Sequence, residues 1–358
     1  MKPLIAISMG DSLGIGAEVL VKSLADQSLR SRARWVIFGE HATMQAAADA
    51  SSLAPCWTTH QDTILATTNF VPQRDGDVML IETEIASQLP PQLLPALMPR
   101  ARAGAASYQF VLAAIELAKL PPDHPWRAHA VVTAPINKHH WSLAGHTRFP
   151  GHTELFAHET GTDRYAMMFH ASAVGSEATN SAPAPGLNVI LVTVHQPLRT
   201  VPNTLTTERI LEVIDLGASQ MQRLGVPHPR IGVCGLNPHA GEHGLLGEED
   251  EYIIAPAVQQ AQAMGHHATG PHPADTIFQS ALSYTDKPPT RFDLVVAMYH
   301  DQGLAPLKTL AWDRAVNLTV GLPFPRTSPD HGTAQDIAGK AIANPASMHA
   351  AMMLASSP

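Results

Sequence analysis

The sequence predicts an α/β fold in which helices cover both faces of a largely parallel sheet. Short runs rich in β-branched and apolar residues alternate along the chain with longer Ala- and Leu-rich runs that have helical spacing. Runs near the middle of the chain are almost continuously apolar, as expected for strands buried on both faces. The chain has 358 residues, 45% of them hydrophobic and 15% charged, and is long enough to form two domains with substantial cores.

The strands and helices follow from these two periodicities. The predicted strands are Leu4–Ser8, Trp35–Phe38, Val78–Ile81, Ala130–Thr133, Ala166–His170, Val189–Val194, Ile231–Gly235 and Leu294–Met298. The predicted helices are Ala17–Ala25, Arg100–Leu120, Thr206–Leu224 and Glu249–Met264. The segment Ser172–Gly186 is rich in Ala, Ser and Pro, which predicts a surface loop or a hairpin extension.

Composition excludes several classes of function. The formal net charge is −8 and no cluster of Lys and Arg is present, which argues against a nucleic-acid surface. No segment reaches the roughly 18 consecutive apolar residues of a membrane span, and the N-terminus enters directly on a strand-like run. The two cysteines, Cys56 and Cys234, lie in apolar contexts and predict no disulfide framework. We therefore expect a cytoplasmic protein that binds a small polar ligand.

Three of the 20 histidines follow the ends of predicted strands: His195, His239 and His300. In open α/β sheets, ligands bind outside the carboxyl ends of the strands, so these imidazoles can converge on one ion. Three nitrogen ligands with one open position suit catalytic zinc, with cobalt, manganese and magnesium as alternatives. No HExxH or CxxC pattern fixes the geometry, and three unrelated histidines bonded to the backbone remain the alternative.

Two loops have a composition that suits anion binding. Gly10–Gly16 lies between the first strand and the first helix, where glycines permit a tight turn and the helix N-terminus attracts negative charge. It lacks the GxGxxG spacing and the P-loop lysine, so a purely structural turn is the alternative. Arg326–Ala334 is a polar, Gly-containing loop after an apolar run, and it either binds a ligand or simply connects two elements.

Six short motifs stand out along the chain: Thr133–Lys138 (TAPINK), Pro150–Glu154 (PGHTE), Leu236–Glu242 (LNPHAGE), Pro273–Thr276 (PADT), Met298–Gly303 (MYHDQG) and Asp330–Ala334 (DHGTA). Taken together, these motifs resemble those of the 4-hydroxythreonine-4-phosphate dehydrogenase family of vitamin B6 synthesis. The resemblance runs from about Leu4 to Met348 in the expected order. It implies the two-domain α/β/α fold of isocitrate and isopropylmalate dehydrogenases and an obligate homodimer with its active site at the domain cleft. The expected domains are 1–130 with 302–358, which holds the NAD loop, and 131–301, which holds the metal ligands and the dimer interface.

The resemblance also implies roles for individual residues. His195, His239 and His300 are the implied metal ligands, with His300 contributed to the partner subunit's site. The implied substrate-binding residues are His152, Thr153, Lys308, Asn317 and Arg326, a set of cations and neutral donors suited to a phosphate. The implied NAD-binding loop contains His331, Gly332, Thr333, Ala334 and Asp336.

The implied reaction oxidises 4-phosphohydroxy-L-threonine with NAD and decarboxylates the product to 3-amino-2-oxopropyl phosphate. A divalent ion activates the hydroxyl group and stabilises the enolate that forms during loss of carbon dioxide. Asp275, Asp301 and Lys138 are three candidates for the base, and a salt-bridge role is the alternative for each.

Some features depart from the family pattern and leave the substrate open. Ser12 and Ala17 stand where the family has Pro, and the Ser172–Gly186 insertion is longer than usual. The alternative substrates are those of paralogues, namely phosphorylated erythronate or threonate, or an aromatic cis-dihydrodiol dicarboxylate such as the terephthalate dihydrodiol. Two other classes are an acyltransferase, which needs no strand-end histidines, and an inactive metal-binding regulator, which has no use for the phosphate-binding set.

Overall fold

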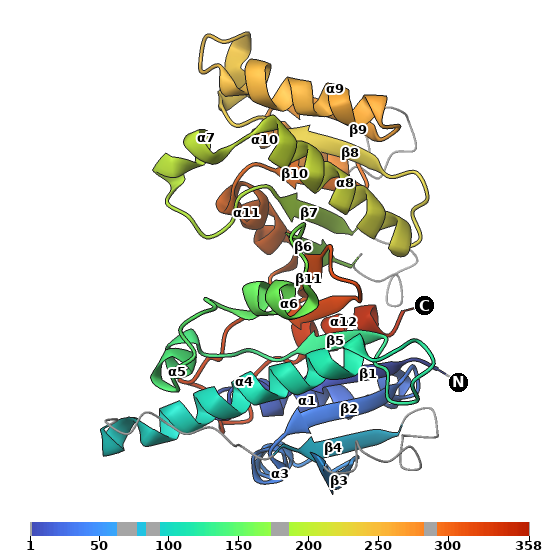
Figure 1. Ribbon diagram of the computed structural model, residues 1–358, viewed down its shortest axis with the longest axis vertical. Coiled ribbons are helices and arrows are strands. Elements are labelled where there is room, and N and C mark those ends of the chain that lie inside the picture. The colour runs from blue at the N-terminus through green and yellow to red at the C-terminus, as the bar shows by residue number, and fades with distance from the viewer. Residues whose placement is uncertain (1, 63–76, 84–93, 173–185, 283–291, 358) are drawn as a thin grey trace. The chain divides into compact units, whose positions relative to one another are not determined.

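The computed structural model describes residues 2–62, 77–83, 94–172, 186–282 and 292–357 and contains two compact units (Figure 1). Unit 1 comprises Met1–Asp163 with Leu322–Pro358, and unit 2 comprises Arg164–Gly321. The boundaries predicted after residues 130 and 301 both fall earlier than these. The physical reason is strand pairing, because residues 130–133 pair with the first strand of unit 1 and residues 315–320 pair with a strand of unit 2.

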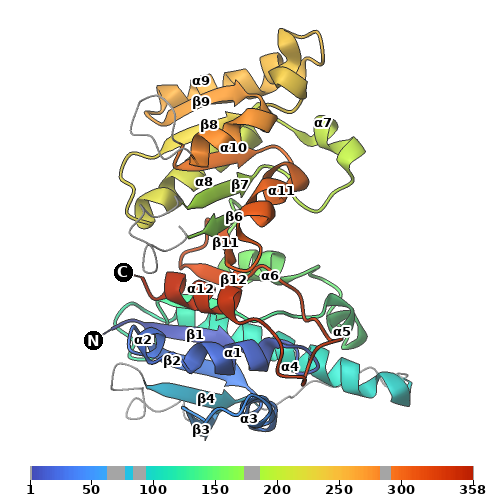
Figure 2. The same ribbon diagram turned by 180° about the vertical axis from the view of Figure 1, so that it is seen from behind.

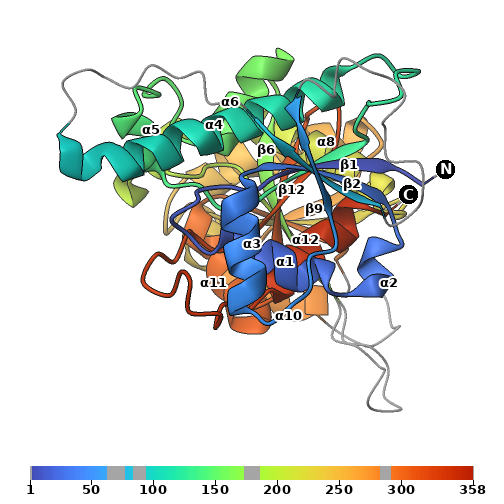
Figure 3. The same cartoon turned by 90° about the horizontal axis from the view of Figure 1, so that it is seen from below.

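Unit 1 contains a parallel sheet of strand order β3-β4-β2-β1-β5-β12. Its strands are β1 (Leu4–Ser8), β2 (Arg34–Gly39), β3 (Thr58–Gln61), β4 (Val78–Glu82), β5 (Ala130–Thr133) and β12 (Arg326–Pro329). Its helices are α1 (Gly16–Leu24), α2 (Gln27–Arg30), α3 (His41–Ala50), α4 (Met98–Lys119), α5 (Lys138–Leu143), α6 (His152–Thr160) and α12 (Ala346–Ala355), with the short turn η2 (Pro95–Leu97). Helix α4 lies on one side of the strands, and α1 and α3 lie on the other (Figure 3). Every residue of β1 and β2 is buried, as this double cover requires.

Unit 2 contains a sheet of order β11-β6-β7-β10-β8-β9, in which β6 is antiparallel to both of its neighbours and the other pairs are parallel. Its strands are β6 (Ala166–Ala171), β7 (Leu187–Leu191), β8 (Arg230–Cys234), β9 (His267–His272), β10 (Leu294–Ala297) and β11 (Ala315–Val320). Its helices and turns are η3 (Leu198–Thr200), α7 (Val201–Thr204), α8 (Thr207–Arg223), η4 (Pro238–Glu242), η5 (Asp250–Ile254), α9 (Ala255–Ala263), α10 (Ala274–Leu282) and α11 (His300–Ala311).

The core of unit 2 is built from the alternating side chains of its strands. Val189 and Leu191 of β7 pack with Leu304 of α11 and Ile277 of α10, the helices that lie in front of the sheet in Figure 2. Gly217 allows α8 to approach the other face closely, since a Cβ atom there would lie 2.5 Å from Leu294 Cδ2. Helices therefore cover both faces, and the predicted α/β class is confirmed.

All eight predicted strands are present, two of them with the predicted bounds and six with ends shifted by one to three residues. The largest shift is in β7, which ends at Leu191 instead of Val194 because the chain bends at residues 192 and 193. β3, β9, β11 and β12 were not predicted, and β3, β9 and β12 are rich in polar residues or proline. The Ser172–Gly186 insertion connects antiparallel β6 and β7, and its residues 173–185 lie outside the described residues. No helix in the described residues is long and apolar enough to cross a membrane.

Candidate active site

The three strand-end histidines lie at one edge of the unit 2 sheet. His195 follows β7, His239 lies in η4 after β8, and His300 is the first residue of α11 after β10. Strand β10 is parallel to β7 on one side and to β8 on the other, so the carboxyl ends of all three strands meet at this edge.

The rings of His195 and His300 lie close to each other. Their ring centroids are 5.6 Å apart with the planes tilted by 43°. Two imidazoles bound to one ion at about 2.1 Å have ring centres roughly 5–6 Å apart, so this spacing suits a shared ion. The Nδ1 atom of His300 contacts Asp301 Oδ1 at 2.7 Å, which leaves Nε2 for a ligand, as is usual for metal-binding histidines. In the described part of a single chain, however, no three His, Cys, Asp or Glu side chains are grouped around a common metal position.

The loop of His239 has an unusual backbone conformation. Residues 239–243 all have positive φ, beginning with His239 at 54°. Left-handed conformations cost non-glycine residues energy, and a run of them persists only when surrounding contacts hold it. The buried carboxylate of Asp250 provides such contacts, because it accepts hydrogen bonds from the backbone amides of Leu236 at 2.8 Å and Asn237 at 3.1 Å. Its Oδ2 atom also accepts a bond from the Asn237 side chain at 3.0 Å.

A separate polar cluster surrounds Arg326 in unit 1. Arg326 begins β12, is 3% exposed, and donates a hydrogen bond from Nη2 to Thr133 Oγ1 at 2.5 Å. Its guanidinium carbon lies 5.6 Å from the centroid of the Phe156 ring, one turn along α6 from His152. Burial lowers the pKa of Arg326 to about 9, and the negative charge of Glu154 opposes that shift.

His152 is the first residue of α6, and Thr153 follows it in the first turn. Burial lowers the pKa of the His152 imidazole well below its usual value, and the charges of Arg326 and Lys138 lower it further. Its Nε2 atom is buried without a hydrogen-bond partner. A neutral imidazole next to a buried guanidinium at a helix N-terminus is an arrangement suited to an anion.

The five predicted substrate residues divide between the units, with Lys308 and Asn317 in unit 2. Lys308 lies on α11, and its Nζ atom is 5.5 Å from the centroid of the Trp312 ring. Asn317 lies on β11, and its Oδ1 atom is buried without a hydrogen-bond partner. The ammonium group of Lys308 and the side-chain amide of Asn317 therefore both belong to unit 2.

The three candidate bases have different surroundings. Lys138 begins α5 and is exposed, and its Cε atom would be 3.2 Å from a Cβ atom placed on Gly151. Asp275 is exposed in the first turn of α10. Asp301 is also exposed but contacts His300. Lys138 is thus the candidate whose charge acts on His152 within unit 1.

The Gly10–Gly16 turn is packed tightly within unit 1. A Cβ atom on Gly10 would lie 2.4 Å from Pro135 O, and one on Gly14 would lie 2.8 Å from Thr333. The backbone amides of residues 11, 13, 14 and 15 all donate to acceptors in the protein, and Ile15 donates to Thr333 O at 2.9 Å. Because these amides already donate hydrogen bonds within the chain, the turn is better explained as a structural turn than as an anion-binding site.

The predicted NAD loop follows β12 and is attached to that turn through Thr333. Ala334 has a φ of 41°, and His331 Nδ1 is 3.0 Å from Gly332 O. Asp336 is exposed. Next to this segment is a surface pocket of about 560 Å³, which is lined by Ser12, Leu13, Gly14, Ala17, Glu18, Ala42, Thr43, Ala46, Ala47, Ala50, Ala338 and Gly339.

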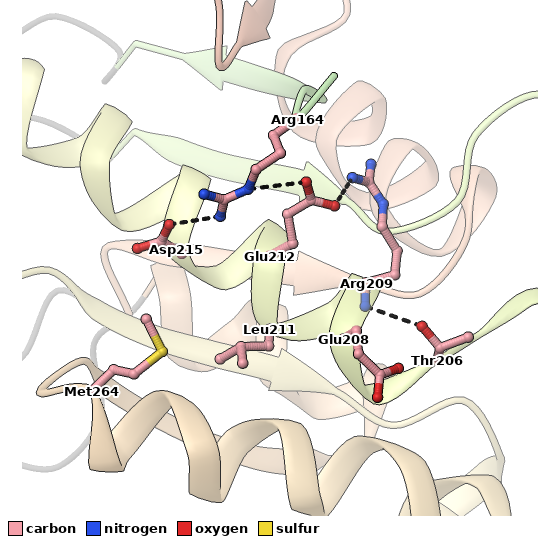
Figure 4. Close-up of a pocket in the computed structure, with 8 residues that line it drawn as sticks. All are labelled: Arg164, Thr206, Glu208, Arg209, Leu211, Glu212, Asp215 and Met264. Atoms are coloured by element: carbon pink, nitrogen blue, oxygen red, sulfur yellow. Dashed lines mark hydrogen bonds and ion pairs between the residues drawn. The ribbon is translucent and has the colours of Figure 1, made fainter. Parts of the chain in front are cut away.

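Another pocket, of about 500 Å³, lies over α8 in unit 2 (Figure 4). Four of its five charged residues pair with one another: Arg164 contacts Glu212 at 3.3 Å and Asp215 at 3.0 Å, and Arg209 contacts Glu212 at 2.7 Å. None of the predicted site residues lines it. We therefore do not assign it to the active site.

Sequence reasoning missed several residues that shape these clusters. Thr133 and Gln302 lie inside two of the family-like motifs, so the signal was present but their partners were unknown. Asp250 and Phe156 lie outside those motifs, and only the fold shows what they contact.

Comparison with known proteins identifies the family. The family model described as "Pyridoxal phosphate biosynthetic protein PdxA" matches residues 31–355. The chain is 38% identical to a 4-hydroxythreonine-4-phosphate dehydrogenase of Geobacter metallireducens, over 99% of this chain and 95% of that protein. It is 40% identical to a D-threonate 4-phosphate dehydrogenase of Cupriavidus necator, over 97% and 94% of the two chains.

A solved structure gives the same result. The crystal structure of a 4-hydroxythreonine-4-phosphate dehydrogenase from Klebsiella pneumoniae superposes with a TM-score of 0.77 at 39% identity, covering 99% of this chain and 98% of that one. The chain therefore belongs to the PdxA family of dehydrogenases.

Proposed function

We propose that this protein oxidises 4-phosphohydroxy-L-threonine with NAD and decarboxylates the product to 3-amino-2-oxopropyl phosphate, a step of pyridoxal phosphate synthesis. The observation that carries the proposal is the buried Arg326 beside His152 in a chain of this family. The second candidate substrate is D-threonate 4-phosphate, because relatives with that name are as similar to this chain as those named for hydroxythreonine phosphate.

Arg326 is the proposed main contact to the substrate phosphate. A guanidinium that is 3% exposed has lost most of its hydration, and a bound dianion compensates its charge. His152 and Thr153 add an imidazole donor and a hydroxyl donor at the N-terminus of α6, where the helix dipole also favours an anion. We assign Lys308 and Asn317 to substrate binding on the basis of the family resemblance.

His195, His239 and His300 are the proposed ligands of a divalent cation, with zinc as the first candidate. The meeting of the carboxyl ends of β7, β10 and β8 at one edge of the sheet and the bond from His300 to Asp301 support this assignment. A divalent ion lowers the pKa of a bound hydroxyl group and stabilises the negative charge that develops on oxygen. The protein's own contribution is to hold the three imidazoles at the carboxyl edge of the unit 2 sheet.

NAD is the proposed hydride acceptor, and NADP is the alternative. We assign its binding to His331, Gly332, Thr333, Ala334 and Asp336. The pocket of about 560 Å³ beside this segment supports the assignment, because it is large enough for an adenosine group and has several alanines among its lining residues.

Lys138 is the preferred base among the three candidates, because its charge, like that of Arg326, acts on the buried imidazole of His152. In this role its amine accepts the proton of the substrate hydroxyl as the hydride departs. Asp275 and Asp301 are the alternatives, and the contact of Asp301 with His300 fits an orienting role for that carboxylate.

We further propose a cytoplasmic homodimer in which His300 serves the partner subunit's site.

The proposed ligands are small molecules and not nucleic acids, which the net charge of −8 supports.

A kinetic panel tests the proposed function. Purified protein is assayed for NADH formation with 4-phosphohydroxy-L-threonine, D-threonate 4-phosphate, D-erythronate 4-phosphate and a terephthalate cis-dihydrodiol, each with Zn²⁺, Mn²⁺ or Mg²⁺. The highest kcat/KM with 4-phosphohydroxy-L-threonine supports the proposal, and a preference for D-threonate 4-phosphate favours the second candidate. Activity on the dihydrodiol with inert phosphorylated acids overturns the phosphate assignment.

A further inference from the structure

Gln302 connects two of the loops that carry the strand-end histidines. It is the third residue of α11, two positions after His300, and is 9% exposed. Its Oε1 atom accepts a hydrogen bond from the backbone amide of Met298 at 2.7 Å. Its Nε2 atom donates to the carbonyl of Gly235 at 2.7 Å. One buried amide therefore joins the end of β10 to the end of β8, where the His239 loop begins.

The connection continues to the third strand. The carbonyl of Met298 accepts hydrogen bonds from Thr193 Oγ1 at 2.7 Å and from the Thr193 amide at 3.2 Å. Thr193 is 7% exposed and lies two positions before His195. The hydrogen bonds of Thr193, Met298, Gln302 and Gly235 thus cross the ends of β7, β10 and β8 in their order in the sheet.

Both ends of the Gln302 side chain are needed for this connection. A carboxylate can accept from Met298 but cannot donate to Gly235, and an aliphatic side chain can do neither. Loss of either bond leaves a buried backbone group without its hydrogen-bond partner. We expect one of the two loops to shift so that this group finds another partner. A shift of the β8 end moves the His239 loop relative to His300.

We propose that Gln302 is a positioning residue that fixes the loops of His239 and His300 relative to each other and thereby sets the affinity for the divalent cation. This inference rests on the proposed function, because it takes these histidines to be metal ligands. It requires only that both loops be held in place, whether the two imidazoles bind one ion within a chain or separate ions in a dimer.

The test measures metal affinity in full-length protein stripped of metal. Zn²⁺ is titrated in competition with a chromophoric chelator, and the thermal unfolding of each metal-free variant is recorded in parallel. Gln302→Leu removes both hydrogen bonds, and Gln302→Glu retains only the bond from Met298. Thr193→Val removes the hydroxyl bond to Met298 with little change in shape. Gln262→Leu is the matched control, because Gln262 donates one side-chain bond to Ala268 O at 2.8 Å in the same unit, remote in sequence from the three histidines.

Both Gln302 variants are expected to bind Zn²⁺ about 10- to 100-fold more weakly than wild type, the range typical of residues that orient metal ligands. Thr193→Val should give a smaller loss, and Gln262→Leu should remain within about twofold of wild type. Unchanged Zn²⁺ affinity in a folded Gln302→Glu protein overturns the inference, as does an equal loss in Gln262→Leu. If Gln302→Leu does not fold, Gln302→Glu and Thr193→Val decide the matter. His195→Ala and His239→Ala are measured alongside, and unchanged Zn²⁺ affinity in both refutes the metal centre itself.

Discussion

The carboxylate of Asp11 and the imidazole of His140 form a buried hydrogen bond of 2.7 Å between Oδ2 and Nδ1. Asp11 belongs to the Gly10–Gly16 turn, which contacts Thr333 of the proposed NAD loop. His140 lies on α5, two residues after Lys138. This bond therefore attaches the turn beneath the cofactor loop to the helix that carries the preferred base.

Removal of the Asp11 carboxylate is expected to destabilise the protein. Asp11→Ala leaves the buried His140 Nδ1 atom and the Leu13 amide without their acceptor, and should lower the free energy of unfolding by about 2–4 kcal/mol. Asp11→Asn retains an oxygen acceptor and should lose about 1 kcal/mol. Urea denaturation measures both values, and equal stability of Asp11→Ala and wild type contradicts the prediction.

Substitution of His239 should remove activity without unfolding the protein. We expect His239→Ala to lower kcat by a factor on the order of 100 or more, because a metal ion contributes several kcal/mol to transition-state stabilisation. His243→Ala is a matched control, since His243 lies on the same loop with a φ of 55° against 54° for His239 and is exposed. Both variants place alanine in the left-handed region, so the backbone penalty cancels between them. Equal activity of the two variants, measured as NADH formation with saturating metal, counts against His239 as a ligand.

Mixed dimers test whether His300 serves the partner subunit's site. A dimer of one His300→Ala chain and one His195→Ala chain, isolated with two different affinity tags, should recover activity because one of its two sites regains all three histidines. A dimer of His195→Ala and His239→Ala chains is the control, since neither of its sites is complete. Absence of recovery in the first hybrid indicates that the His195 and His300 rings, 5.6 Å apart, act within one chain.

Much of the fold could be predicted because its central strands are apolar and buried on both faces. Leu4–Ser8 and Ala130–Thr133 were predicted with their observed bounds. β12 was missed because its sequence, RTSP, has no apolar pattern, although all four residues are buried. Tertiary contacts explain this burial, since Arg326 Nη2 donates to Thr133 and Thr327 Oγ1 donates to Ala351 O at 2.9 Å.

The candidate site was only partly predictable for a related reason. The sequence places His195, His239 and His300 at strand ends, but it does not state that β10 lies between β7 and β8. That order brings the three ends to neighbouring positions and allows Gln302 to reach Gly235, which is distant in the sequence. The domain boundaries were placed too early because pairing of β5 with β1, and of β11 with β6, has no local signal.

Anion binding should weaken at alkaline pH if Arg326 holds the phosphate. Burial lowers the pKa of Arg326 to about 9, so the free protein loses this proton as the pH rises through 9, well before an exposed arginine would. The increase in Tm produced by inorganic phosphate should therefore be full at pH 7 to 8 and decline above about pH 9. Arg326→Met should show little phosphate-dependent increase at any pH. A phosphate effect in Arg326→Met as large as in wild type would exclude this residue as the anion site.

Arg326→Ala should nearly abolish turnover of a phosphorylated substrate. Loss of a guanidinium contact to a dianion costs on the order of 2–5 kcal/mol of transition-state binding, which corresponds to roughly 30-fold to several thousand-fold in kcat/KM. Arg230→Ala is the control, because that arginine is exposed and pairs with Asp293 at 3.1 Å. Thermal unfolding of both variants without ligand separates a folding defect from a binding defect. If the contact to phosphate accounts for the lost transition-state binding energy, wild type and Arg326→Ala should turn over a substrate without phosphate equally well. An equal decrease in kcat/KM on both substrates would instead assign Arg326 to the substrate carboxylate.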